Sequence, residues 1–178
     1  SIAGYFFGKA INQKLKVPVG LIASYWGGTN VQSWMTNEVF ENNAELKNLA
    51  DDTKPVNWAP TEPSVIYNSM LHPLVNYNIA GAIWYQGEGN TGEPQNYGKL
   101  FEGLIKGWRK AFDKEFPFYF VQIAPWNGYW KNSSAYLREQ QAYVLSLPKT
   151  GMISVGDLVD NISDIHPRIK KEVGNRLV

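Results

Sequence analysis

The sequence has no cysteine and only two histidines among its 178 residues. The absence of cysteine excludes disulfide-stapled scaffolds, thiolate nucleophiles and cysteine-based zinc sites. An excess of one charge is lacking too, since 17 Lys and Arg against 16 Asp and Glu give a formal net charge of +1. Phosphate backbones and anionic lipid surfaces bind basic proteins, so we expect neither a nucleic acid nor a membrane as partner.

Long hydrophobic runs are missing as well. No stretch approaches the roughly 20 apolar residues of a membrane span, and the N-terminus lacks the basic-then-apolar pattern of a signal peptide. What the chain does have is 44% apolar residues, with 7 Trp, 10 Tyr and 8 Phe. This composition and length predict one globular domain, residues 1–178, with a sizeable core.

Short apolar runs alternate with helical patterns along the chain. Near-continuous apolar runs predict buried strands, and apolar residues at steps of three and four predict helices. Such alternation with short connections predicts an α/β fold with right-handed crossovers and a parallel sheet covered by helices on both faces. The expected strands are 19–25, 79–85, 116–123 and 151–155, and the expected helices are 1–16, 31–49, 67–75, 97–112, 134–147 and 168–178.

Ligands of such sheets bind beyond the carboxyl ends of the strands. The segments that follow the expected strands are WGGTN (26–30), QGEGN (86–90), APWNG (124–128) and the stretch ending in DIHP (164–167). We therefore expect the chemistry of the protein to come from these four segments.

The two histidines are the only side chains suited to general-base catalysis near neutral pH. Asp164 lies two residues before His166, where its carboxylate can orient the imidazole and stabilise its cation. The competing interpretation is that both residues cap the helix expected after them. His72 falls within a helical apolar pattern, where a structural role is the better interpretation.

Glycines and amides at the strand ends are candidates for stabilising an oxyanion. The backbone N–H groups of Gly27 and Gly28 follow an expected strand, although a tight turn explains these glycines equally well. Gln86 and Asn90 offer neutral amide donors for the same purpose. Glu88 between them suggests an alternative, the acid of a glycosidase pair, which requires a second carboxylate across the scissile bond.

Aromatic residues are dense near the expected strand ends. Exposed members of this set are suited to stacking on the apolar faces of sugars, and buried members to core packing, which we expect for at least half of them. The set comprises Tyr25, Trp26, Trp34, Trp84, Tyr85, Trp126, Tyr129 and Trp130.

Taken together, five motifs resemble the sialate O-acetylesterase-like carbohydrate esterases of the SGNH/GDSL hydrolase superfamily. The resemblance follows the family's order over essentially the whole chain. It is carried by VPVGLIASYWGGTNVQSWM (17–35), IAGAIWYQGEGN (79–90), FPFYFVQIAPW (116–126), LREQQ (137–141) and DIHPRIKKEVGNRLV (164–178).

The resemblance implies a flavodoxin-like three-layer α/β/α sandwich and a serine esterase that uses no metal or other cofactor to remove acetyl groups from sugars. It implies that His166 is the general base and that Asp164 orients it, with Asp160 or Asp157 as alternative acids. The oxyanion donors would be Gly27 or Gly28 together with Gly87 and Asn90, with Gln86 as a further candidate. Contacts to an acetylated carbohydrate would come from Trp26, Glu88 and Arg138.

The family's nucleophile lies in a Gly-Gln-Ser-Asn type motif after the first strand, and no segment of this sequence matches that motif. We therefore expect the serine and the first strand to lie upstream, on residues or a complementing chain not included here. By resemblance alone, the full-length protein would be periplasmic or secreted. The competing hypotheses are a sugar-binding module without a nucleophile and a glycosidase that uses Glu88.

Overall fold

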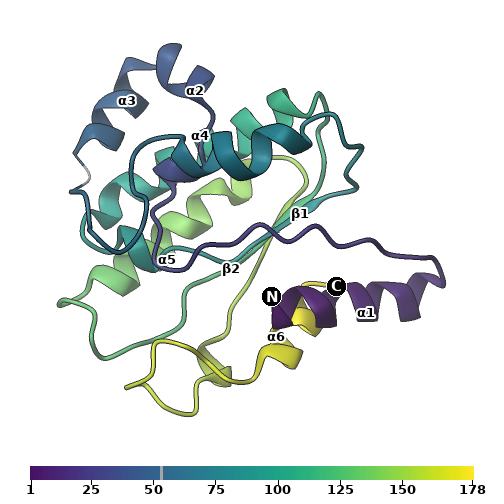
Figure 1. The fold of residues 1–178 in the computed structure, drawn as a ribbon. Helices are drawn as coiled ribbons and strands as arrows, with labels where there is room; N and C mark the ends of the chain where they lie inside the picture. The colour runs from purple at the N-terminus through teal and green to yellow at the C-terminus, as the bar shows by residue number, and fades with distance from the viewer. Residues whose placement is uncertain (53) are drawn as a thin grey trace.

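Three parallel strands form the centre of the computed structural model, which describes residues 1–52 and 54–178. The strands are β1 (Ala82–Trp84), β2 (Phe118–Val121) and β3 (Thr150–Ile153). They lie in the order β1-β2-β3, and Figure 1 labels the first two of them. In the register, Ala82 pairs with Phe118 and Phe118 pairs with Thr150. The expected parallel α/β fold is confirmed.

The helices expected at 1–16 and 97–112 form nearly as predicted, whereas the helix expected at 31–49 is divided into three shorter helices. The α-helices are α1 (Ile2–Leu15), α2 (Asn37–Glu41), α3 (Ala44–Asp51), α4 (Tyr97–Ala111), α5 (Ser133–Tyr143) and α6 (Lys170–Arg176). Single turns complete the set: η1 (Gln32–Trp34), the π-helical η2 (Tyr67–Leu71), η3 (His72–Leu74), η4 (Glu88–Asn90), η5 (Pro94–Asn96), η6 (Val144–Ser146) and η7 (Gly156–Leu158). Within the described residues, no helix is long and apolar enough to cross a membrane.

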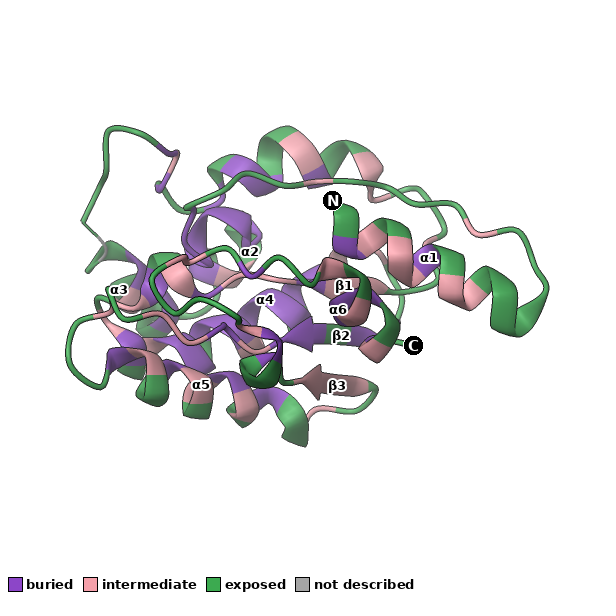
Figure 2. Cartoon of the chain, turned by 90° about the horizontal axis from the view of Figure 1, so that it is seen from below, coloured by how far each residue is buried: buried purple, intermediate pink, exposed green. Residues whose placement is uncertain are grey.

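Apolar side chains pack on both faces of the sheet, because successive residues of a strand point to opposite sides. Phe118 and Phe120 of β2 belong to the larger core cluster, together with the buried face of α4. Val121 belongs to a second cluster that includes Ala3 of α1 and Val173 of α6. Figure 2 shows buried residues along α4, α5 and β2. Helices therefore cover both faces, which gives the three layers.

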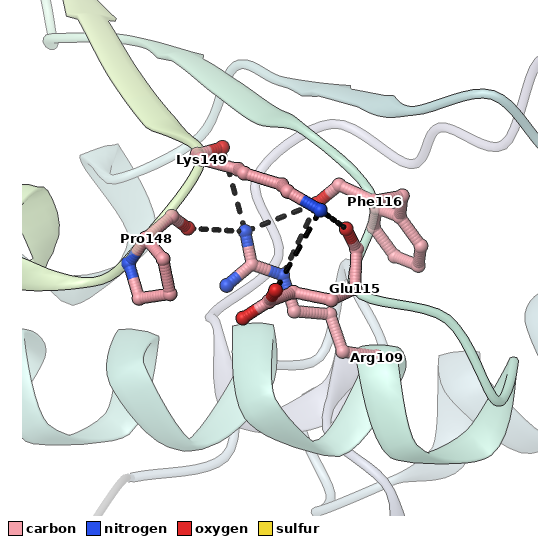
Figure 3. Close-up of polar contacts among 5 residues, drawn as sticks. All are labelled: Arg109, Glu115, Phe116, Pro148 and Lys149. Atoms are coloured by element: carbon pink, nitrogen blue, oxygen red, sulfur yellow. Dashed lines mark hydrogen bonds and ion pairs between the residues drawn. The ribbon is translucent and has the colours of Figure 1, made fainter.

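An arginine fastens the amino-terminal ends of two strands. Arg109 of α4 donates from Nε and Nη2 to the carbonyl oxygen of Phe116, at 3.1 and 3.0 Å, and from Nη2 to the carbonyl oxygen of Pro148 at 2.8 Å (Figure 3). Phe116 precedes β2 and Pro148 precedes β3. The planar guanidinium thus satisfies carbonyl groups that the strands leave unpaired where they begin.

The strand expected at 19–25 is not formed, and this prediction was wrong. The segment belongs to none of the strands among the described residues, and Leu21, Ile22 and Tyr25 are 49%, 52% and 65% exposed. An extended segment becomes a strand only when a neighbour pairs with its backbone groups, and no described strand lies beside this one. The other three strands form, but each is shorter than its apolar run.

Candidate functional site

The first two strand-end segments meet through hydrogen bonds around Thr29. The Thr29 hydroxyl donates to the carbonyl oxygen of Trp26 at 2.9 Å and accepts from the indole N–H of Trp34 at 2.9 Å. The Thr29 carbonyl accepts from Nε2 of Gln86 at 2.9 Å. A Cβ on Gly89 would lie 2.5 Å from that carbonyl oxygen, so only glycine allows this close approach of the two backbones.

Gly27 and Gly28 form the exposed turn that leads into Thr29. Gly28 has a φ of +76°, in the left-handed region that favours glycine. The backbone N–H groups of both glycines are free of acceptors within the described part of the chain. They are therefore backbone donors that remain available to a ligand. They belong to the rim of the site, by which we mean the carboxyl-terminal edge of the sheet with the segments that follow its expected strands.

Asn90 is buried and braces the two segments against each other. Its Oδ1 accepts from the backbone N–H of Val31 at 2.8 Å and from Nε2 of Gln86 at 2.9 Å. Its Nδ2 donates to Oε1 of Gln32 at 2.8 Å. The second hydrogen on Nδ2 has no acceptor among residues 1–52 and 54–178, so Asn90 retains one donor.

Gln86 and Gly87, which the sequence suggested as oxyanion donors, are engaged in contacts within the protein. Both N–H groups of Gln86 are engaged, one by Thr29 and one by Asn90, and its Oε1 accepts from the Tyr97 hydroxyl at 3.0 Å. A Cβ on Gly87 would lie 2.5 Å from Ile123. In this arrangement Gln86 positions Asn90 and Thr29 and has no donor left for an oxyanion.

The segments after β2 and β3 are also joined to each other, and they carry the imidazole. Asn127 donates from its backbone N–H to the Ile162 carbonyl oxygen at 2.8 Å and from Nδ2 to the Ser163 hydroxyl at 3.0 Å. In the loop that follows, Oδ1 of Asp164 lies 3.5 Å from Nδ1 of His166 and accepts from the His166 backbone N–H at 2.9 Å. The His166 side chain is 85% exposed, so its other ring nitrogen is open to a ligand.

The alternative acids lie in different settings. Asp157 forms a two-point ion pair with Arg176, at 2.7 and 2.5 Å, and this guanidinium lowers the pKa of its carboxyl. Asp160 is exposed. Of the three aspartates, Asp164 is the one whose carboxylate lies beside the imidazole, with 3.5 Å between Oδ1 and Nδ1.

A cluster of ionisable groups surrounds Glu88, between the amide site and the imidazole. Burial raises the pKa of the Glu88 carboxyl, while the backbone N–H groups of Glu88 and Gly87 and the nearby charges of Lys170 and His166 hold the rise down. Burial lowers the pKa of Lys170, whose Nζ lies 4.8 Å from the centre of the Tyr85 ring. Glu88 belongs to the second strand-end segment and His166 to the fourth, so a charge of the fourth segment acts on the carboxyl of the second.

Burial and then the Glu88 charge raise the pKa of Tyr85 and Tyr129, and the charge of Arg138 opposes the rise at Tyr129. The hydroxyls of both tyrosines and Nη1 of Arg138 are buried and lack a hydrogen-bond partner among the described residues. Arg138 therefore lies near the ionisable groups around Glu88, and its Nη1 can donate to a ligand or water.

Two of the eight aromatic residues are buried, three are partly buried and three are exposed. Trp34 and Trp84 are buried in the core, whereas Tyr25, Trp26 and Trp130 are 65%, 52% and 73% exposed. Sequence reasoning overlooked Trp58, which is 64% exposed and touches Gly28. It lies in a proline-rich loop far from any expected strand end, so no signal in the sequence related it to the site.

The arrangement combines a base with an adjacent acid, free backbone N–H groups and an amide donor. These are the groups that acyl transfer needs apart from the nucleophile. Within the described residues, no group of three or more acidic or histidine side chains is arranged to hold a metal ion. The fold is that of an α/β protein whose strand-end segments carry these polar groups.

Comparison with known proteins identifies the family. The family model described as carbohydrate esterase, sialic acid-specific acetylesterase, matches residues 2–178, and this chain belongs to that family. The chain is 31% identical to the sialate O-acetylesterase of Rattus norvegicus and 34% identical to that of Homo sapiens, over 97% of its own length in both cases. A crystal structure of a carbohydrate acetylesterase from Xanthomonas citri matches 98% of the chain with a TM-score of 0.84 and 36% identity.

The match covers only part of each relative. The chain spans 40% of the rat protein, 37% of the human protein and 39% of the chain in the crystal structure.

Proposed function

We propose that this chain forms part of a serine esterase that removes O-acetyl groups from carbohydrates. The observation that carries the proposal is the Asp164–His166 pair, in which a carboxylate lies 3.5 Å from an exposed imidazole. The N–H groups of Gly27 and Gly28, which no acceptor of the described chain engages, support it. Membership of an acetylesterase family supports the same conclusion. Neither relative nor neighbour supports the glycosidase or the non-catalytic sugar-binding module.

In the proposed reaction, a serine hydroxyl attacks the acetyl carbonyl carbon and gives its proton to Nε2 of His166. Asp164, 3.5 Å from Nδ1, orients the ring and stabilises the imidazolium. The oxyanion accepts hydrogen bonds from Gly27 or Gly28 and from the remaining Nδ2 hydrogen of Asn90. Collapse of the intermediate expels the sugar oxygen, which takes the proton from His166, and water then hydrolyses the acetyl-serine by the same route.

The serine itself is proposed to come from residues outside this chain. The family resemblance assigns it to a Gly-Gln-Ser-Asn type motif that has no counterpart in these 178 residues. The exposed, unpaired segment 19–25 supports a missing neighbour strand, since its apolar side chains and backbone groups are otherwise left in water. Trp26, Glu88 and Arg138 are proposed to contact the sugar.

The test is active-site labelling of the complete protein with a fluorophosphonate, together with release of acetate from an acetylated xylo-oligosaccharide. We expect one labelled serine outside residues 1–178 and loss of acetate release on labelling. The matched control is His166→Ala, which should label much more slowly because its serine lacks a base. Acetate release without any labelled serine would contradict the serine mechanism.

A periplasmic or secreted location of the full-length protein is a separate proposal, made from the family resemblance. Fractionation of the source cells tests it.

A further inference from the structure

Three exposed aromatic residues lie next to the Gly27–Gly28 turn, in the chain or in space. Tyr25 and Trp26 directly precede Gly27 and Gly28, and Trp58 reaches Gly28 from a distant part of the chain. Their side chains are 65%, 52% and 64% exposed. Single exposed aromatic residues need no explanation, but Trp58 is both exposed and packed on a glycine that offers a free backbone N–H, which directs attention to it.

Trp58 is held against Gly28 by a fixed loop. A Cβ on Gly28 would lie 2.0 Å from Cζ3 and 2.7 Å from Cη2 of Trp58, so the edge of the indole occupies the space that glycine leaves open. Next to Trp58, Ala59 is buried, and the Thr61 carbonyl oxygen accepts from Nδ2 of Asn30 at 3.0 Å. Pro60 further restricts the backbone. The ring therefore has a set position while most of its surface faces solvent.

We infer that Trp58 is a specificity-determining residue: its indole is the platform on which the pyranose ring of the acetylated substrate stacks. This inference rests on the proposed function. If the acetyl carbonyl oxygen binds at the Gly28 N–H, the ester oxygen and the sugar ring follow one and two bonds beyond the carbonyl carbon. They then lie beside the residue that touches Gly28, which is Trp58.

The chemistry of the platform selects a class of sugar. A pyranose whose hydroxyl groups are equatorial presents axial C–H groups on both faces, and such an apolar face packs on an indole. Among the described residues, the cation–π contacts are those of Lys131 with Trp130 and Lys170 with Tyr85, and none involves Trp58. The platform therefore suits a neutral sugar such as a xyloside. Ethyl acetate carries the same acetyl ester without a ring, and it gains nothing from stacking.

The experiment compares the complete enzyme with its Trp58→Ala and Trp58→Phe variants on two esters, an acetylated methyl xyloside and ethyl acetate. We expect Trp58→Ala to lower the ratio of kcat/KM for the xyloside to kcat/KM for ethyl acetate about tenfold, through KM, as for the loss of one stacking contact. Trp58→Phe should recover part of the ratio. Tyr77→Ala is the matched control, since Tyr77 is 68% exposed and lies before β1, at the opposite end of the sheet.

An equal loss for both esters would give Trp58 a structural role at the Gly28 turn and overturn the inference, as would an unchanged ratio. A binding measurement separates this result from failure of the proposed function. With 5-fluorotryptophan in the protein, the fluorine resonance that Trp58→Phe removes should shift when methyl β-xylopyranoside is added, whether or not the protein hydrolyses esters. A resonance that stays in place at saturating xyloside would reject the platform.

Discussion

The two ends of the parallel sheet are built differently. At the amino-terminal end, Nε and Nη2 of Arg109 donate four hydrogen bonds to the carbonyl oxygens of Phe116, Pro148 and Lys149, before β2 and β3. At the carboxyl-terminal end, the N–H groups of Gly27 and Gly28, one Asn90 hydrogen and the His166 ring remain open. Substitutions at the amino-terminal end should therefore lower the free energy of unfolding, and substitutions at the carboxyl-terminal end should lower kcat.

The largest effect is expected from His166→Ala in the complete enzyme. Loss of a general base typically lowers kcat by about 10² to 10⁴-fold, and we expect a value in the upper part of this range. The side chain is 85% exposed, so the free energy of unfolding should change by less than about 0.5 kcal/mol. Acetate release and thermal denaturation measure the two quantities, and retention of full activity would remove His166 from the mechanism.

Asn90→Ala combines both kinds of effect. Loss of one oxyanion donor typically lowers kcat about 10² to 10³-fold. The substitution also leaves the buried N–H of Val31 without its acceptor, which costs about 1–3 kcal/mol of folding free energy. Both are measurable well below Tm, by initial rates and by urea denaturation.

Gln86→Met separates the structural role of the Gln86–Asn90 hydrogen bonds from a catalytic role of Asn90. Both N–H groups of Gln86 are already engaged, so this variant should lose stability comparably to Asn90→Ala but lose much less kcat. A larger loss of kcat for Gln86→Met than for Asn90→Ala would reverse the assignment of the oxyanion donor.

These contrasts also show what the sequence can predict. Helix α4 was predictable because Leu100, Leu104 and Trp108 recur on one face, and burial of that face decides the structure locally. The run 19–25 looked equally convincing as a strand. A helix satisfies its own backbone groups, however, whereas a strand depends on a neighbour, and the sequence of one segment does not reveal whether the neighbour is present.

The candidate site shows the same limit at the level of single groups. Asp164 and His166 are close in the chain, so their pairing was predictable. Gln86 and Asn90 were both recognised as amide donors, but the sequence does not show which donors are consumed by partners such as Thr29 or Gln32. The environment of Glu88 depends on Lys170, 82 positions away in the chain, and was not foreseeable from spacing.

Arg109→Lys tests the amino-terminal end. A lysine ammonium lacks the planar fork that reaches the Phe116 and Pro148 carbonyl groups together. We expect a loss of about 1–2 kcal/mol in the free energy of unfolding, since hydrogen bonds from charged donors contribute in this range and the site is partly exposed. kcat should stay at the level of the unchanged enzyme. A change in kcat without a change in stability would contradict the division of the two ends.

The smallest effect is expected for Glu88, a residue of the carboxyl-terminal rim whose ionisation affects the stability of the protein. Burial places the folded-state pKa of Glu88 above its ordinary value of 4.5, so the folded protein binds this proton more tightly than the unfolded chain does. The stabilisation is therefore complete below pH 4.5 and is lost as the pH rises through the folded-state pKa. Glu88→Gln imitates the protonated form, so its Tm relative to the unchanged protein should increase between pH 4 and pH 8.

Lys170→Met sharpens this prediction. The charge of Lys170 favours the ionised form of Glu88, so its removal should make the loss of stability between pH 4 and pH 8 larger than in the unchanged protein. In the double variant with Glu88→Gln this additional pH dependence should disappear. A Tm difference between Glu88→Gln and the unchanged protein that is constant with pH would show that the carboxylate is solvated in the folded state. Any pH dependence of stability between pH 4 and pH 8 would then have to come from the titration of another group.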